Sequence, residues 1–226
     1  MLYRSIYMRI HLFTAFIFIF LHSTNGFSQQ IDPDGSFTIE LGLPNSFTNK
    51  PFKDIMQGLV SVCPYYQYAF KNGLAFGIGG HYSYFAVNEF SVPSAVYGGM
   101  HTLAAFVKTS HEKFWGERFA TDIGIKFGYA HTMIKTDVLI SDGVLLNILQ
   151  STYIEPCLGL ILSSDAANSY RLTIGYPFYG FGFKPWSIGI EGNIGYDESA
   201  FSKVSSFLIV GFGFTHYFNG KNAVDE

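Results

Sequence analysis

The sequence predicts an all-β fold, an antiparallel up-and-down transmembrane β-barrel with eight strands, on three observations. Of the 226 residues, 48% are hydrophobic and 14% are charged, against about 25% charged in an average soluble domain. Apolar and polar residues alternate along the chain, which is typical of strands with two different faces. No apolar run after the N-terminal segment reaches the roughly 18 residues of a spanning helix. Without spanning helices, an apolar chain crosses a membrane only as a closed barrel, because closure pairs every backbone group.

Residues 1–28 are expected to be a cleaved signal peptide. Arg4 and Arg9 form a basic start, and an apolar stretch of about 12 residues follows, before small residues at a cleavage point after Ser28. An uncleaved helical anchor is the alternative, but this stretch is shorter than the roughly 20 residues that span a bilayer. The barrel is expected over 29–218 and a polar C-terminal tail over 219–226.

The first four strands are expected over 36–44, 60–70, 74–85 and 98–109. In the first, Phe37 and its apolar neighbours two residues apart oppose Glu40. The second ends at Lys71-Asn72-Gly73, a tight-turn signal that leads into the third. In the third, aromatic and aliphatic residues alternate with Ala, Gly, His81 and Ser83. The facing of the fourth is ambiguous.

The last four strands are expected over 118–132, 152–163, 170–183 and 207–218. In the fifth, Ile125 opposes Asp122 and Lys126, and in the eighth, alternate Phe residues oppose glycines. The segment 186–196 could itself be a strand. We interpret it as a hairpin-like extension of an outside loop, and a ten-stranded barrel is the fallback.

The connections alternate in length, with short ones after the second, fourth and sixth strands and longer ones after the others. Outer-membrane barrels have short periplasmic turns, longer outside loops and an even number of strands. The alternation therefore predicts a protein of the bacterial outer membrane with both termini in the periplasm.

The apolar face is expected to point to lipid, since its aromatic residues gather near both strand ends around an aliphatic band. Two aromatic girdles are typical of lipid-facing barrels, whereas a soluble lipocalin-type barrel turns its apolar side inward. The residues expected at the membrane interfaces are Tyr68, Phe70, Tyr82, Tyr84, Phe119, Tyr129, Phe214 and Phe218.

The export signal, the eight alternating segments and the final strand FLIVGFGFTHYF resemble the small outer-membrane β-barrel protein family, the OmpA/OmpX-like eight-stranded barrels. The resemblance covers 36–218 and is one of pattern, without a unique motif. It implies insertion by the barrel-assembly machinery, which reads the last strand with its terminal Phe218. The eight-residue tail after Phe218 departs from family members that stop at the aromatic residue.

A charge network is expected to fill the lumen, because a charge buried without compensation costs several kcal/mol. Lys126 and Glu155 lie at one level of adjacent strands and are expected to pair, which would block ion flow. The inward face is also expected to carry other charged residues: Glu40, Arg118, Asp122 and Arg171.

No catalytic, cofactor or metal site is predicted. His81 and Ser83 share one strand face, a weak hydrolase signal without an obvious third group, so structural packing is the preferred interpretation. Cys63 and Cys157 fall on the inward faces of opposite walls, too far apart for a disulfide, and two free, buried thiols are expected. The net charge of −3 gives no reason to expect nucleic acid as a partner.

The predicted function is therefore that of a non-enzymatic outer-membrane protein, a monomer in lipid, with a structural or contact role through its extracellular loops. A lipid-modifying acyl hydrolase or transferase and a narrow channel remain as alternatives. Exposed-looking loop aromatics could bind a partner, although packing over the barrel mouth is the favoured interpretation: Phe47, Phe52, Phe90 and Trp186.

Overall fold

The described residues of the computed structural model are 34–46, 49–92, 96–116, 118–165, 167–192 and 195–218. The expected signal peptide, the polar tail and Phe47 lie outside these residues.

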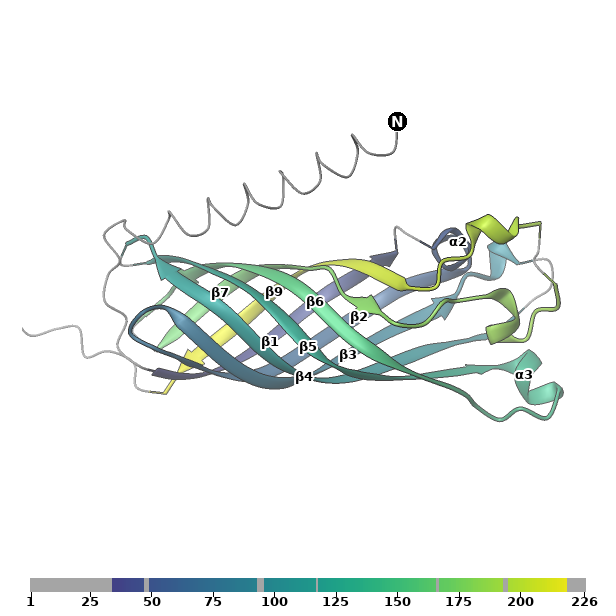
Figure 1. The fold of residues 1–226 in the computed structure, drawn as a ribbon, viewed down its shortest axis with the longest axis horizontal. Helices are drawn as coiled ribbons and strands as arrows, with labels where there is room; N and C mark the ends of the chain where they lie inside the picture. The colour runs from purple at the N-terminus through teal and green to yellow at the C-terminus, as the bar shows by residue number, and fades with distance from the viewer. Residues whose placement is uncertain are drawn as a thin grey trace, which may run out of the picture. The chain divides into compact units, whose positions relative to one another are not determined.

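The described chain forms one antiparallel sheet that closes into a barrel (Figure 1). Its strands are β1 (Asp34–Ser46), β2 (Met56–Ala69), β3 (Leu74–Val87), β4 (Gly98–Phe114), β5 (Phe119–Thr136), β6 (Asn147–Ser163), β7 (Asn168–Gly175), β8 (Phe178–Tyr179) and β9 (Ser205–Tyr217). The first strand pairs with the last, with Ile39 opposite Phe214, so no edge of the sheet is left open. The short β8 continues β7 between the same two neighbours, β6 and β9, so the barrel has eight strands as predicted.

The seventh wall is interrupted at Tyr176 and Pro177, between β7 and β8. Proline has no N–H to give to the ladder, which explains why pairing stops there. The prediction of one continuous strand over 170–183 is therefore wrong in detail. The described residues of 186–196 do not form a strand: a 3-10 helix, η3 (Pro185–Ile188), turns back at Gly189 with φ of 88°.

Short turns join the strands at one end of the barrel and long loops at the other. The loop end carries α2 (Lys50–Ile55), α3 (Asp137–Ser141) and two further 3-10 helices, η2 (Glu89–Ser91) and η4 (Glu198–Ala200). The alternation of lengths is as predicted, but β4 runs on to Phe114, so the turn expected from Ser110 comes later. Asn49 caps α2 by accepting a hydrogen bond from Phe52 N at 3.2 Å. No helix among the described residues is long and apolar enough to cross a bilayer.

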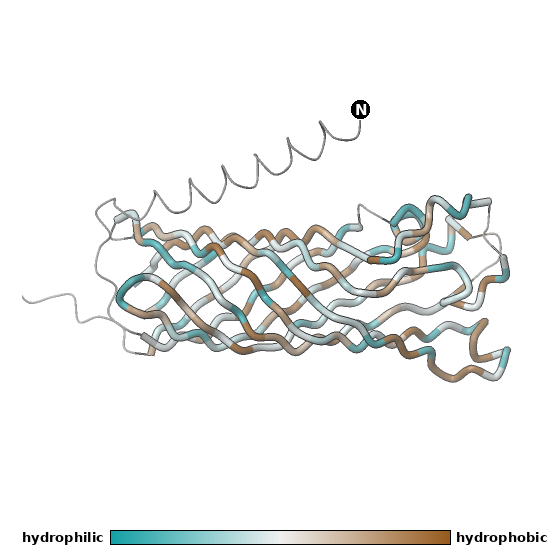
Figure 2. The backbone as a smooth tube through the Cα atoms, viewed as in Figure 1, coloured by the Kyte–Doolittle hydropathy of each residue, from teal (hydrophilic) through white to brown (hydrophobic). Residues whose placement is uncertain are grey.

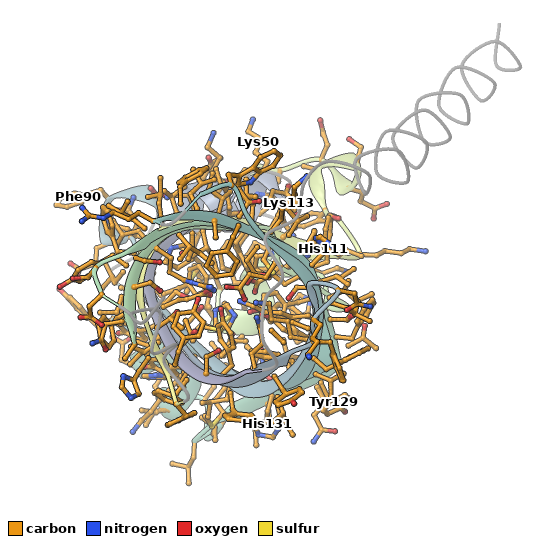
Figure 3. The ribbon with its side chains drawn as sticks, turned by 90° about the vertical axis from the view of Figure 1, so that its left-hand side faces the viewer. Lys50, Phe90, His111, Lys113, Tyr129 and His131 are labelled. Atoms are coloured by element: carbon orange, nitrogen blue, oxygen red, sulfur yellow. The ribbon has the colours of Figure 1, made fainter. Side chains whose placement is uncertain are left out.

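Hydrophobic and hydrophilic residues follow one another along the strands of the barrel (Figure 2), and the apolar side chains lie on its outer face. Phe212 is 75% exposed and Ile78 is 64% exposed on the outer face, whereas Lys126 is 1% exposed inside. Side chains fill the ring of the sheet when the barrel is viewed along its axis (Figure 3). The interior has a charged half on the side of the short turns and an aromatic half on the side of the long loops.

Candidate functional site: the filled lumen

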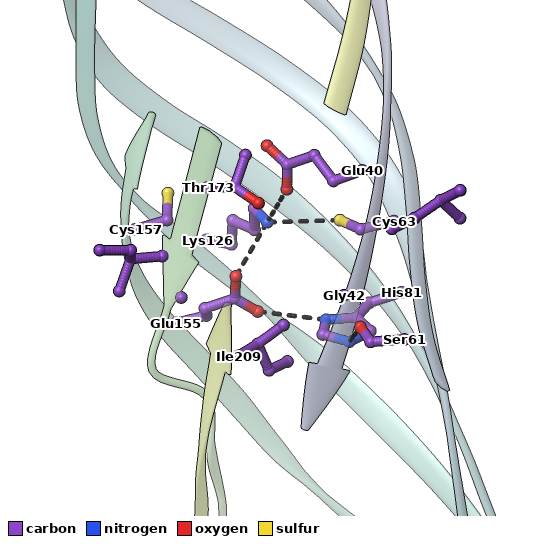
Figure 4. A pocket seen from close by; sticks show the side chains of 13 residues that line it. Glu40, Gly42, Ser61, Cys63, His81, Lys126, Glu155, Cys157, Thr173 and Ile209 are labelled. Atoms are coloured by element: carbon purple, nitrogen blue, oxygen red, sulfur yellow. Dashed lines mark hydrogen bonds and ion pairs between the residues drawn. The ribbon is translucent and has the colours of Figure 1, made fainter. Parts of the chain in front are cut away.

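Lys126 is the centre of the charged half. Its amino group donates to Glu155 Oε1 at 2.9 Å, Glu40 Oε2 at 3.1 Å and Cys63 Sγ at 3.3 Å (Figure 4). These partners come from β6, β1 and β2, and Glu155 lies directly opposite Lys126 in the β5–β6 register. One buried ammonium therefore ties together strands from different walls; we call this group the Lys126 cluster (Glu40, Cys63, Lys126 and Glu155).

A second cluster lies nearer the short turns, around Asp122. Its Oδ2 accepts from Lys108 Nζ at 2.5 Å and from Arg171 Nη1 at 3.2 Å. Arg171 also donates to the Tyr65 hydroxyl and lies 3.6 Å from Glu40 Oε1, which joins the two clusters. The Lys108 ammonium sits 4.5 Å from the Tyr65 ring centroid, a favourable cation–π geometry. We call this group the Asp122 cluster (Tyr65, Lys108, Asp122 and Arg171).

Glu112 differs from the other lumen carboxylates, because the ion pairs among the described residues do not include it. It accepts from Gln67 Nε2 at 3.1 Å and from the Tyr217 hydroxyl at 2.8 Å. Gln67 in turn accepts from Lys108 Nζ at 2.7 Å, so it links this carboxylate to the Asp122 cluster. The described lumen holds four carboxylates, Glu40, Glu112, Asp122 and Glu155, against three permanent cations, Lys108, Lys126 and Arg171.

His81 lies at the border between the two halves. Its Nε2 is 2.9 Å from both Ser61 Oγ and Ser83 Oγ, and its Nδ1 is 2.6 Å from the Tyr153 hydroxyl and 3.1 Å from Glu155 Oε2. A serine, an imidazole and an orienting carboxylate are the groups of a hydrolase triad. The sequence paired His81 with Ser83, while the third group, Glu155, comes from β6 on another wall.

The surroundings of His81 argue against hydrolysis. His81 is 3% exposed, and the adjoining cavity, lined by Glu40, Ser61, Cys63, Lys126, Glu155 and Thr173 among others, has a volume of about 20 Å³. A space of this size is large enough for about one water molecule and too small for an acyl chain. The arrangement therefore orders the lumen, and a lipid substrate has no room beside the serines.

Four aromatic rings close the barrel at the loop end; we call them the aromatic plug (Phe52, Phe85, Phe183 and Phe207). The Phe52 ring, carried by α2, lies 5.1, 5.0 and 4.9 Å from the other three centroids, and all four are at most 1% exposed. Asn49 Nδ2 donates to Phe183 O at 3.3 Å and ties α2 to the last loop. Packing over the mouth thus holds for Phe52, whereas Phe90 and Trp186 are 100% and 58% exposed.

The predicted interface aromatics all project from the outer face or from turns. Six of the eight are exposed, and Tyr129 points away from the barrel in Figure 3. The Tyr129 hydroxyl donates to Gln150 Oε1 at 2.9 Å. Tyr82 and Tyr84 are half-buried because they pack on His101, with a Tyr82 Oη to His101 Nδ1 distance of 2.9 Å. Tyrosine and histidine tips of this kind suit the polar edge of a bilayer.

Cys63 and Cys157 are both free thiols, on β2 and β6; Cys63 is buried as predicted, whereas Cys157 is only half-buried. Both line the small lumen cavity, and Cys63 accepts from Lys126. Within the described residues no group of three His, Cys, Asp or Glu side chains is arranged to hold a metal ion.

Five of the six charged residues that the sequence placed in the lumen come together in the two clusters. The sixth was misplaced, and two further partners were missed. Lys108 and Glu112 lie directly opposite Lys126 and Asp122 in the β4–β5 register. A correct prediction of the turn between β4 and β5 would therefore have placed both side chains in the lumen. Arg118 was expected in the lumen and lies exposed in the turn before β5. A turn position directs a side chain to water, whereas the strand begins only at Phe119.

No protein-family model and no curated protein matches this chain. Among solved structures, it is similar to Ail, the attachment invasion locus protein of Yersinia pestis, with 11% identity and a TM-score of 0.48 over 83% of this chain and 100% of that one. Neisserial surface protein A shows 10% identity and a TM-score of 0.47 over 82% and 96% of the two chains. The outer membrane protein OprG from Pseudomonas aeruginosa shows 7% identity and a TM-score of 0.47 over 83% and 97%. Identities at this level say nothing of ligand or partner.

Proposed function

We propose that this chain is a non-enzymatic integral protein of a bacterial outer membrane, whose plugged barrel holds structured loops on the outer side of the cell. The proposal rests on the distribution of side chains, which is the reverse of that in a soluble protein. Charged groups are buried in the lumen, while Leu43, Ile78, Val107 and Phe212 are exposed on the outside.

This distribution favours lipid around the barrel over water. Soluble monomers rarely expose contiguous apolar patches beyond about 600 Å², because water disfavours such surface. Here outward apolar side chains recur on every long strand, from Leu41 on β1 to Phe214 on β9. A closed barrel leaves no unpaired strand edge, which is the other condition for spanning a bilayer.

The filled lumen supports a structural or contact role rather than transport or catalysis. Ion pairs occupy the turn side and the aromatic plug occupies the loop side, so the interior offers no continuous path to an ion. The cavity beside His81 is too small for a lipid substrate, which disfavours the hydrolase alternative. The even number of strands and the short turns favour both termini in the periplasm. We further propose that the chain functions as a monomer, with membrane lipid and the barrel-assembly machinery as its partners.

Heat modifiability tests whether the barrel folds as a closed sheet. Folded protein in detergent should run differently on a cold gel before and after boiling, because a fully paired sheet resists unfolding by detergent alone. Planar-bilayer recordings should show no steady conductance. Steady single-channel currents from the unmodified protein would contradict the plugged lumen.

Replacing Ile125 with Arg tests the lipid-facing surface directly. Ile125 lies outward on β5, and an arginine there should cost about 2–4 kcal/mol of folding free energy in bilayers if the site is near the midplane. Val144→Arg, in the exposed loop before β6, is the matched control and should be nearly silent. Equal effects of the two substitutions on urea unfolding in lipid vesicles would mean that the outer face does not contact lipid.

A further inference from the structure

A pocket of about 500 Å³ opens at the loop end, apart from the lumen. Its lining comes from both arms of the long connection between β8 and β9: Gly182 and Lys184 on one side, and Glu198, Phe201, Ser202 and Lys203 on the other. This volume falls within the roughly 300–1,000 Å³ range of small-molecule sites. The pocket is thus large enough for a mono- or disaccharide.

The charge of the pocket favours an anion. Neither Lys184 nor Lys203 forms an ion pair among the described residues, and Glu198 is the one acidic side chain of the lining. The whole chain carries a net charge of −3, so this local excess of positive charge is not a general property of the surface. Two lysines in the lining of one pocket, each able to turn its ammonium group toward the opening, would attract a carboxylate, sulfate or phosphate group.

The other lining groups suit a sugar better than a bare ion. Phe201 is half-buried and its ring contacts Tyr196, with centroids 6.4 Å apart. An aromatic ring held in this way offers apolar surface to the C–H face of a pyranose. Ser202 Oγ accepts from Val204 N at 3.2 Å, which leaves its O–H free to donate, and the Glu198 carboxylate can accept from sugar hydroxyls.

The walls of the pocket are held in place by packing. A Cβ atom at Gly182 would lie 2.2 Å from Ser202 O, so the two arms approach too closely for any other residue there. The next residue, Phe183, belongs to the aromatic plug and is 0% exposed. The pocket therefore rests on the rigid end of the barrel, and a ligand would find it formed in advance.

We propose that this pocket binds an acidic saccharide, with the sugar carboxylate between Lys184 and Lys203 and the ring against Phe201. Binding of the saccharide to the pocket does not depend on the membrane and can be measured in detergent. Access of a sugar from outside the cell does depend on it, and this part rests on the proposed outward orientation of the loops.

Titration of the folded full-length barrel in detergent tests the chemistry, with digalacturonate as the acidic probe and lactose as the neutral one, followed by saturation-transfer NMR. Digalacturonate should bind and lactose should not. Lys184→Gln and Lys203→Gln together should weaken binding at least about tenfold, since each removes a charge-assisted hydrogen bond. Lys50→Gln, an exposed lysine of α2 outside the pocket, should leave binding unchanged.

Three results would overturn the proposal: no binding of digalacturonate, an equal loss in Lys50→Gln, or full competition by inorganic phosphate at equal concentration, which would reduce the pocket to a simple anion site. Fluorescent digalacturonate on intact cells separates the two proposals. Binding in detergent that is absent on cells would refute the outward orientation of the loops and support the pocket.

Discussion

The two halves of the barrel interior are both filled by side chains, but by side chains of different chemistry. On the turn side, buried charges such as Lys126 and Asp122 each hold partners from other strands. On the loop side, rings such as Phe52 and Phe207 fill the space without directional bonds. An ion pair fails when one partner is removed, because the other is left charged in a dry environment, whereas a ring can be replaced by another apolar group of similar volume. Substitutions in the charged half should therefore lower the free energy of unfolding more than substitutions in the aromatic half.

The largest effect is expected from Lys126→Met. Removing this ammonium leaves Glu40 and Glu155 facing one another without their shared cation, and should destabilise the barrel by about 3–5 kcal/mol. Urea unfolding of the folded protein in detergent measures the loss. Glu155→Gln, alone and combined with Lys126→Met, completes a double-mutant cycle, and a coupling energy near zero would mean that the pair adds nothing to the fold.

A smaller effect is expected from Phe183→Leu in the aromatic plug. Leucine retains most of the buried apolar volume, so the cost should be about 1.5 kcal/mol or less in the same unfolding assay. Phe183 contacts Phe52 with centroids 5.0 Å apart and carries no side-chain hydrogen bond to lose. A loss as large as that of Lys126→Met would abolish the distinction between the halves.

Glu112 sharpens the comparison within the charged half. Because Glu112 has no ion pair among the described residues, Glu112→Gln removes a buried negative charge. Its one oxygen can still accept from Gln67, and its amide NH2 can donate to the Tyr217 hydroxyl, which then acts as the acceptor. We expect a change within about 0.5 kcal/mol, or a slight gain, since replacing an uncompensated charge relieves a desolvation cost. Asp122→Asn is the matched substitution at an ion-paired site and should be clearly destabilising. Equal losses would show that pairing does not set the cost.

The smallest effect is expected outside the barrel, at Asp165 in the exposed turn between β6 and β7. Hydrogen bonds from the Asn168 side chain and from Ala167 N hold the pKa of Asp165 below its ordinary value. A carboxylate with a lowered folded pKa stabilises the fold above its unfolded pKa of about 3.9, and loses this contribution as the pH falls through the folded value. The stability difference between the natural protein and Asp165→Asn should therefore shrink below about pH 4. A stability difference that stays constant with pH would contradict this role of the Asp165 carboxylate.

The strand faces could be predicted because alternation records which side each residue takes. Phe37, Ile125 and Phe214 lie outside and Glu40 and Lys126 lie inside, as their spacing indicates. The facing of the fourth strand could not be predicted, because polar and apolar residues are mixed on both of its faces. Met100 and Phe106 point inward, while His101 and Thr109 point outward. Lys108 was missed for that reason, whereas Glu112 was missed because it was expected in the turn after the strand and β4 runs on to Phe114.

The loop end could not be derived from alternation, because contacts distant in sequence determine it. Phe52 and Phe183 meet across more than a hundred residues, and the capped helix α2 that carries Phe52 gives no period-two signal. The pocket at Lys184 and Lys203 likewise depends on the approach of Gly182 to Ser202. His81 was found with Ser83, but Glu155 is 74 residues away in the chain and its contact follows only from closure.

Closure of β1 against β9 also determines when the charged half can form. Thr38 reaches Thr215 across 177 residues, so this contact between the first and the last strand needs nearly the whole chain. Glu40 reaches Lys126 across 86 residues, from β1 to β5. Contacts of such sequence separation form late in folding. Before these contacts form, the lumen carboxylates and amines have no such partners, and charged groups in this state favour contact with water. In the proposed outer-membrane protein, the side chains that neutralise one another in the finished barrel would thus be the groups that keep the unfolded chain soluble before it enters the lipid.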